Sequence, residues 1–380
     1  MTPTTIRDVA QVAGVSIATA SRVLTGSRST SEASRERVLA AADQLHYRVN
    51  AHARALRSAR SGTAGLLVPD IRNPFFAELA HTVQTELFRH GMSTLIGSAS
   101  EDGTQQDRHL RDLLEQQIDG VILAPQGGST PVLEAMAAEG VPMVFVDRVA
   151  PGLEVPFVDS DPSPGIQQAV QDLIAVGHQR IAFVAGPLNT STGHDRLEAF
   201  TRIAREHLPP ADTPVIHAGY DTEACVAGLE EQLADGIRAF VFGYSPNTLT
   251  ALPHFRRTGW HVGGDVSVVS FDDIEVFTLV DPRISVISQH VHEMGRLAVG
   301  MLDMILAGGV PSSTRLSTTL IRRDSVTAPA TSIPPPSSPS SPPVPPAPRV
   351  PTPAPIPPPT GAPVPTPACS TPLAPEVAPS

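Results

Sequence analysis

Apolar residues in the first 47 positions recur every three or four residues, in three short blocks with polar residues between them. This spacing places the apolar side chains of each block on one face of a helix. Gly14 separates the first two blocks, and Thr5 followed by Asp8 predicts a capping box, with a short acid in the usual Glu/Gln position. The three apolar faces consist of Ile6, Val9, Ala10 and Ala13, of Ala20, Val23 and Leu24, and of Val38, Ala42 and Leu45. Two short helices joined by a glycine turn and covered by a third predict a helix-turn-helix head.

The pattern changes after Ala64 to short apolar runs that alternate with helical stretches. The runs occur at 65–69, 92–98, 119–125 and 141–147, and again at 180–187, 240–243 and 265–273. The helical stretches lie near 75–90, 104–117, 129–139, 192–208, 221–235 and 246–258. Buried strands alternating with helices are typical of parallel sheets, so we expect an α/β body of two doubly wound subdomains. Ligands bind such sheets beyond the carboxyl ends of the strands, which predicts a site in the cleft between the subdomains.

Proline and charge divide the chain into three parts. The segment 328–380 contains 22 of the 40 prolines and only two charged residues, so we expect a disordered, Pro-rich tail. All 27 basic residues are arginines. Residues 1–60 hold nine of them against four acids, whereas residues 61–327 hold 17 against 33 acids. A basic head (+5) on an acidic body (−16) predicts that the head binds a polyanion such as nucleic acid.

Several classes of protein do not fit the sequence. Cys225 and Cys369 are the only cysteines, which argues against a disulfide framework or a cysteine-based metal site. No apolar run approaches the ~18 residues of a membrane span, and the polar N-terminus does not resemble a signal peptide. His290 and His292 are poorly spaced for a shared metal ion, and neither a dinucleotide fingerprint nor a nucleophile elbow is present. We therefore expect a cytoplasmic protein that is not an enzyme and holds no metal or cofactor.

The second predicted helix has the side chains needed to read DNA. Ser16 is a good N-cap for it. In a DNA major groove, the side chains facing the bases would be Ile17, Ala18, Ser21 and Arg22, and those reaching phosphates would be Ser16 and Thr19. Arg22 can donate two hydrogen bonds to guanine, a contact worth roughly 1–3 kcal/mol of discrimination. The pattern alone is also compatible with solvated residues on a small helical bundle.

The stretch TIRDVAQVAGVSIATASRVLTG (residues 5–26) resembles the DNA-binding motif of the lactose-repressor family of bacterial transcription regulators. The resemblance continues through NAHARALRSARSG (50–62) and the body to about Arg323. It implies a periplasmic-binding-protein-like body with three crossovers, and a hinge that becomes helical and pairs with a second copy on operator DNA. Leu56 matches the leucine that wedges into the minor groove; a buried linker residue is the alternative reading. The further DNA contacts that the resemblance implies are Thr5, Ile6, Tyr47, Asn50 and Ala53.

Candidate ligand-binding residues follow the ends of the predicted strands. The candidates placed there directly are Phe75, Phe76, Asp147 and Arg148. By resemblance, Arg196 matches the ligand-contacting arginine, and Asp272 matches the carboxylate that accepts hydrogen bonds from sugar hydroxyls or base nitrogens. Gln289, after the last crossover, is a further candidate. An aromatic face, a fork of donors and a carboxylate together recognise a polar ring, although each charged residue could instead belong to a structural ion pair.

Two departures from the family pattern affect the ligand assignment. Asp161 is followed by Pro162 instead of the usual Asn, which also removes a backbone donor. Tyr244 and Ser245 replace the usual Asn-containing pair, so Tyr244 either stacks on a ligand or fills the cleft. These changes leave open a ligand other than a standard pentose or hexose, and also a cleft that no longer binds a small molecule.

We therefore predict a transcription regulator that binds a palindromic double-stranded operator as a homodimer or larger oligomer. We expect it to be a repressor, because most members of the family are repressors. A small sugar-like effector would control it, and its DNA-bound form would be associated with the nucleoid. The expected parts are a DNA-binding domain (1–49), a hinge helix and linker (50–62), an effector-binding and dimerisation body (63–327) and a tail (328–380). A secreted sugar-binding transport protein shares the body's fold, but such a protein would need a signal peptide and would have no DNA-reading head.

Overall fold

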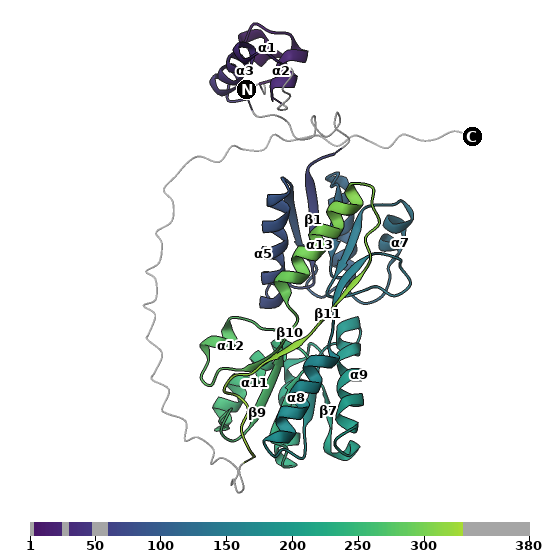
Figure 1. Cartoon of the computed structure of the whole chain (residues 1–380), viewed down its shortest axis with the longest axis vertical. Coiled ribbons are helices and arrows are strands. Elements are labelled where there is room, and N and C mark those ends of the chain that lie inside the picture. The colour runs from purple at the N-terminus through teal and green to yellow at the C-terminus, as the bar shows by residue number, and fades with distance from the viewer. Residues whose placement is uncertain (1–3, 25–29, 48–59, 330–380) are drawn as a thin grey trace, which may run out of the picture. The chain divides into compact units, whose positions relative to one another are not determined.

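The computed structural model describes residues 4–24, 30–47 and 60–329. The candidate DNA contacts Asn50, Ala53 and Leu56 lie outside these ranges. Within the described ranges, no helix is both long and apolar enough to cross a bilayer. The described residues form a three-helix head and a body of two α/β subdomains (Figure 1).

The head consists of three helices, as the apolar spacing predicts. Their bounds are Ile6–Val12 (α1), Ile17–Leu24 (α2) and Glu32–Gln44 (α3). At the start of α1 the backbone N–H of Thr5 donates to the Asp8 carboxylate at 2.8 Å, and this bond holds the pKa of Asp8 below its usual value. Gly14 has a φ of +62°, a left-handed conformation that glycine adopts without strain, and it forms the turn into α2.

The three helices enclose a small aliphatic core. The buried core residues are Val9, Ala10, Ala13, Ala20, Val23, Val38, Ala41 and Ala42. Half-buried residues that pack against this core are Ile6, Val15, Leu24, Leu45 and Tyr47. The apolar faces predicted for the three helices are therefore confirmed.

The first subdomain is built on a six-stranded parallel sheet in the order β11–β5–β4–β3–β1–β2. Its strands are β1 (Thr63–Val68), β2 (Ser93–Ser98), β3 (Gly120–Leu123), β4 (Met143–Val146), β5 (Phe157–Asp161) and β11 (Thr314–Ser317). Its helices are α5 (Pro74–Arg89), α6 (Gly103–Glu115), α7 (Pro131–Ala138) and α13 (Val291–Leu306). α5 and α13 lie side by side (Figure 1). β3 and β4 are completely buried, as expected of parallel strands covered on both faces.

The second subdomain has a six-stranded sheet in the order β12–β10–β9–β8–β6–β7, parallel except for β12. Its strands are β6 (Ala182–Ala185), β7 (Val215–His217), β8 (Ala239–Phe242), β9 (Ser267–Phe271), β10 (Ser285–Ser288) and β12 (Thr319–Ile321). Its helices are α8 (Ser163–Ala175), α9 (Ser191–Arg205), α10 (Thr222–Ala234), α11 (Ser245–Thr258) and α12 (Val276–Leu279). The two doubly wound subdomains predicted from the alternation of strands and helices are confirmed.

Three crossovers join the subdomains, after β5, after β10 and after β11. The first crossover passes through Pro162, which lies between β5 and α8. The strands that the apolar alternation did not predict are those at the crossovers and sheet edges, namely β5, β7, β10, β11 and β12. They are three to five residues long and each contains at least one polar residue, so none of them forms a long apolar run.

Candidate functional site

α2 presents the predicted base-reading side chains on the surface of the head. Ile17 is 43% exposed although it is apolar, and Ala18 and Arg22 are also exposed. Ala18 and Arg22 are one helical turn apart, and the Arg22 Nε–H donates to the Ala18 carbonyl at 3.3 Å. Ser21 is half-buried. The exposed face of α2 therefore combines apolar groups with an arginine, the side chains expected on a helix that enters a major groove.

Four other predicted DNA contacts have structural roles in the head. The backbone N–H of Thr19 donates to Ser16 Oγ at 3.1 Å, and the two hydroxyl oxygens lie 2.9 Å apart. Ser16 thus caps α2, as expected of a serine at this position. Ile6 and Tyr47 pack against the head core. These contacts hold α2 in place, in addition to any contact that the same residues make with DNA.

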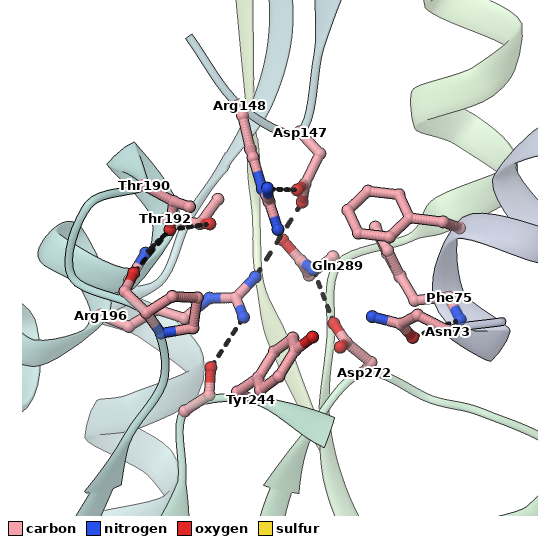
Figure 2. A pocket seen from close by; sticks show the side chains of 14 residues that line it. Asn73, Phe75, Asp147, Arg148, Thr190, Thr192, Arg196, Tyr244, Asp272 and Gln289 are labelled. Carbon is pink, nitrogen blue, oxygen red and sulfur yellow. Dashed lines mark hydrogen bonds and ion pairs between the residues drawn. The ribbon is translucent and has the colours of Figure 1, made fainter. Parts of the chain in front are cut away.

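A cavity lies between the two subdomains, beyond the carboxyl ends of their strands (Figure 2). All the ligand-binding candidates from the sequence line it: Phe75, Phe76, Asp147, Arg148, Arg196, Tyr244, Asp272 and Gln289. The further lining residues are Asn73, Pro187, Thr190, Thr192, Gly193 and Gly243. The free space is about 20 Å³, room for about one water molecule. A larger ligand therefore requires the subdomains to separate or side chains to move.

One wall of the cavity is aromatic and comes from the first subdomain. Asn73 caps α5, since its Oδ1 accepts a hydrogen bond from the Phe75 backbone N–H at 3.1 Å. The rings of Phe75 and Phe76 pack edge to face with their centroids 5.1 Å apart. Both phenylalanines are buried, so the cap and the ring contact fix where the aromatic wall stands.

Asp147 follows β4 and is the least satisfied group in the cavity. Its φ is +62°, a conformation that is rare for residues other than glycine. It is 3% exposed, and its Oδ1 has no hydrogen-bond partner among the described residues. Arg196 Nη2 lies 4.0 Å from this oxygen, too far for a hydrogen bond. Burial raises the pKa of Asp147 to about 6, against the opposing effects of Arg196 and Arg148. Its other oxygen, Oδ2, lies 3.8 Å from Arg148 Nε, so Asp147 has charged neighbours although Oδ1 accepts no hydrogen bond from the part of the chain that the structure describes. A buried carboxylate oxygen without a hydrogen bond in a cleft is typical of a functional site.

Arg196 reaches the cavity from α9, in the second subdomain. Its Nη1 donates to the Gly243 carbonyl at 2.8 Å, and its guanidinium carbon lies 4.2 Å from the centroid of the Phe271 ring. The first turn of α9 passes very close to the preceding loop, because a Cβ on Gly193 would lie 2.0 Å from the Pro187 carbonyl oxygen. Only glycine fits at this position, and it sets the direction in which α9 delivers Arg196.

Asp272 is buried like Asp147 but is fully hydrogen-bonded. It accepts a bond from the Ser245 hydroxyl at 2.6 Å and another from the Gln289 side-chain amide at 2.7 Å. The amide oxygen of Gln289 in turn accepts a bond from the Ser160 hydroxyl at 2.5 Å. Gln289 therefore orients Asp272, and Ser245, one of the residues that departs from the family pattern, supplies its second partner.

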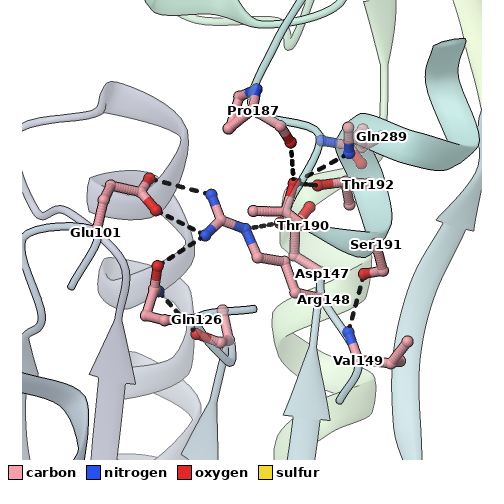
Figure 3. Close-up of polar contacts among 12 residues, drawn as sticks. Glu101, Gln126, Asp147, Arg148, Val149, Pro187, Thr190, Ser191, Thr192 and Gln289 are labelled. Carbon is pink, nitrogen blue, oxygen red and sulfur yellow. Dashed lines mark hydrogen bonds and ion pairs between the residues drawn. The ribbon is translucent and has the colours of Figure 1, made fainter. Parts of the chain in front are cut away.

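Arg148 belongs to a cluster that was not predicted from the sequence (Figure 3). Its Nη1 donates to Glu101 Oε2 at 2.7 Å and to Gln126 Oε1 at 3.0 Å, and its Nη2 donates to Glu101 Oε1 at 3.0 Å. Burial lowers the pKa of Arg148, but the hydrogen bonds and charge of Glu101 outweigh this and raise it. From the second subdomain, the Tyr220 hydroxyl donates to Glu101 Oε2 at 2.7 Å. Arg148 is thus held by an ion pair at the edge of the cavity.

A second bond crosses between the subdomains, from the Val149 backbone N–H to Ser191 Oγ at 3.1 Å (Figure 3). Glu101 lies just beyond the end of β2 and Tyr220 just beyond the end of β7. The rule that ligand sites lie beyond the carboxyl ends of strands could have indicated Glu101, since β2 was predicted. It could not have indicated Tyr220, because β7 was not.

Comparison with known proteins covers both the head and the body. The family model "Bacterial regulatory proteins, lacI family" matches residues 5–50, and the model "Periplasmic binding protein-like domain" matches residues 170–326. The HTH-type transcriptional regulator GalR of Salmonella typhimurium is 31% identical over 331 residues, which cover 86% of this chain and 96% of GalR.

Solved structures agree with the sequence comparison. A lac repressor dimer bound to operator and the anti-inducer ONPF matches with a TM-score of 0.75 and 25% identity, over 86% of this chain and all of that one. The complex of the transcriptional regulator CelR with cellobiose matches with a TM-score of 0.62 and 29% identity, over 85% of this chain and 99% of CelR. With its helix-turn-helix head and two-subdomain body, this chain belongs to the lacI family of bacterial regulatory proteins.

Proposed function

We propose that this protein is a transcriptional repressor that binds a palindromic operator as a dimer and responds to a small, sugar-like effector in its cleft. The proposal rests on two features that occur in the same chain. One is the exposed face of α2 with its arginine, and the other is a cleft lined by polar groups from both subdomains. Residues 1–49 would bind DNA, 50–62 would form the hinge, 63–327 would bind effector and dimerise, and 328–380 would form a tail without an assigned role. The protein would act in the cytoplasm, on chromosomal DNA.

In this proposal α2 lies in the major groove, with Ala18 and Arg22 toward the bases and Ser16 toward a phosphate. Two copies related by a twofold axis then read two half-sites, so the operator is a palindrome. Leu56, outside the described residues, is proposed to wedge into the minor groove at the operator centre. The basic head supplies the charge that attracts DNA, and the acidic body stays away from it.

The cleft is proposed to hold a polar ring. Oδ1 of Asp147, which accepts no hydrogen bond from the described residues, would accept one from a ligand hydroxyl, and Arg196 Nη2 would donate one. Phe75 and Tyr244 would contact the faces of the ring. This arrangement matches a sugar-like effector, and a related structure, that of CelR, holds cellobiose.

The effector would act by changing the angle between the subdomains. The bonds that cross between the subdomains include Tyr220 to Glu101 and Val149 to Ser191. Opening of the cleft to admit a ligand would break these two bonds, and a bound ligand would replace them with its own contacts. Such a change would alter the separation of the two hinges in the dimer, and coupling of this type is typically worth about 1–3 kcal/mol.

A second candidate function is a repressor whose cleft binds no small molecule. This alternative is favoured by the small size of the cavity, because the side chains that line the cleft leave only about 20 Å³ of free space. Under this alternative the same operator is bound, but metabolites do not release the protein. A metabolite that changes operator affinity decides for the first candidate.

Dimerisation is proposed to involve apolar residues of α12, where Leu279 is 74% exposed. We expect Leu279→Ser to raise the dimer dissociation constant about tenfold, since each copy loses apolar burial at the interface. Sedimentation velocity over a range of protein concentrations measures this constant. Val310→Ser is the matched control, because Val310 is 93% exposed in the loop between α13 and β11 and is not placed in the interface. An equal effect of both substitutions, or no effect of Leu279→Ser, would contradict this interface.

A gel shift tests the proposed function as a whole. The purified full chain is titrated against the intergenic DNA that flanks its own gene, with a scrambled fragment of equal length as competitor at fixed salt. We expect a discrete complex that the scrambled fragment does not displace. A protein that binds both fragments equally is not a sequence-specific regulator of that region.

A further inference from the structure

Glu101 is held in a conformation that few residues adopt. Ser100 and Glu101 have φ values of +50° and +58°, both in the left-handed region that favours glycine. The Glu101 backbone N–H donates to the Pro69 carbonyl at 2.9 Å, and Asp102 directly afterwards caps α6. Non-glycine residues persist in this region only where their surroundings over-determine it, and such sites are often functional.

The carboxylate of Glu101 is aimed at the cleft, where it meets Arg148. The two oxygens face the two terminal nitrogens of the guanidinium at 2.7 and 3.0 Å, the bidentate geometry that gives the strongest carboxylate–arginine pairs. Both side chains are largely buried, with Arg148 at 3% and Glu101 at 11% exposed. Phe76 lies beneath the guanidinium, with its ring centroid 5.3 Å away. The charge of Arg148 is therefore neutralised inside the protein.

The remaining charges of the cleft do not favour an anion. Asp147 and Asp272 are both carboxylates, and Arg196 is the only guanidinium left to balance them among the described residues that line the cavity. Arg196 is also engaged with the Gly243 carbonyl and the Phe271 ring. The helix N-termini at the cavity offer little more. The first turn of α9 donates a backbone N–H to Thr190, and α5 is capped by Asn73.

We propose that Glu101 is a specificity-determining residue: its carboxylate is a permanent counter-ion for Arg148, so that the cleft takes an uncharged polyhydroxylated ligand and rejects a phosphorylated or carboxylated one. This inference rests on the proposed function, because it names the ligand class of the same cleft. A phosphate entering the cleft would meet the carboxylate of Asp147 and find both terminal nitrogens of Arg148 already bound to Glu101. A neutral hydroxyl would instead donate to Asp147.

The experiment uses inorganic phosphate as the probe and isothermal titration calorimetry as the readout, at constant ionic strength. For Glu101→Gln, which keeps the size of the side chain and an acceptor for Tyr220, we expect phosphate to bind at least about tenfold more tightly than to the wild type, because the charge of Arg148 is no longer neutralised by the Glu101 carboxylate. The double variant Glu101→Gln/Arg148→Met should lose this gain. Tyr220→Phe removes the hydrogen bond from Tyr220 to Glu101 across the cleft but leaves every charge in place. We therefore expect this variant to bind phosphate no more tightly than the wild type does.

Two results would overturn the proposal. The first is phosphate binding to the wild type that Arg148→Met weakens about tenfold, since Arg148 would then be available to anions. The second is a folded Glu101→Gln variant without tighter binding; circular dichroism establishes the folding, and Glu101→Ala replaces this variant if it does not fold. Operator binding of each variant is measured in parallel by gel shift. If the wild type binds operator and also binds phosphate through Arg148, only this inference is wrong. If the wild type binds no operator, the proposed function is wrong.

Discussion

Replacing Arg22 with alanine is expected to remove most of the protein's preference for its operator over other DNA. Arg22 lies one turn after Ala18 on the exposed face of α2. An arginine can donate two hydrogen bonds to one guanine, and losing them costs roughly 1–3 kcal/mol of discrimination. Because a dimer reads two half-sites, the expected loss is about 2–6 kcal/mol, or roughly 30-fold to 20,000-fold in relative affinity.

Fluorescence anisotropy with operator and scrambled duplexes of equal length, at one salt concentration, measures this preference as a ratio of affinities. Arg7→Ala is the matched control, since Arg7 is exposed on α1 and its loss removes the same charge. A phosphate-type contact weakens both duplexes alike, so the ratio should survive in this control. If the two substitutions lower the ratio equally, or Arg22→Ala leaves it unchanged, α2 does not read the bases through Arg22.

The parts of the fold that could be predicted from the sequence are those with a strong local pattern. Strands such as β3 and β4 are unbroken apolar runs bounded by helical stretches, and burial on both faces of a parallel sheet requires this pattern. The strands β5 and β11 carry no such pattern, because they lie at one edge of the first sheet and contain polar residues that pair with each other. One example is Arg315 of β11, which binds Asp159 of β5 at 2.5 Å.

The candidate site was predictable to the extent that it follows topology. Asp147 and Asp272 both come directly after strands, and parallel strands bring their carboxyl ends to one edge. The partners of these residues were not predictable, because pairing depends on how two subdomains approach each other. Tyr220 meets Glu101 across the cleft, 119 positions apart in the chain, and no local pattern in either segment indicates the other.

Replacing Asp147 with asparagine is expected to stabilise the folded protein at neutral pH. Burial raises the pKa of Asp147 to about 6 from its ordinary value of 3.8, although Arg196 and Arg148 act against this rise and Asp272 and Asp159 add to it. Between these two pH values the folded protein holds a proton that the unfolded chain has released. Titration of Asp147 therefore lowers the free energy of unfolding of the wild type as the pH rises from about 4 to above 6. The total loss from this group is up to about 3 kcal/mol. Asparagine carries no charge and avoids this cost.

Urea denaturation of both proteins at pH 7.5, 6 and 4.5 measures the effect, in which the advantage of Asp147→Asn is largest at pH 7.5 and shrinks as the pH falls. Asp272→Asn is the matched control: Asp272 is equally buried at 3% exposed, but it accepts two hydrogen bonds, so its substitution should cost roughly 1–3 kcal/mol. Destabilisation by both substitutions at pH 7.5 would mean that Asp147 is paired in solution. The charge of Asp147 lowers the stability of the folded protein, and a role in ligand binding would explain why a carboxylate lies there. Functional sites commonly trade stability for binding.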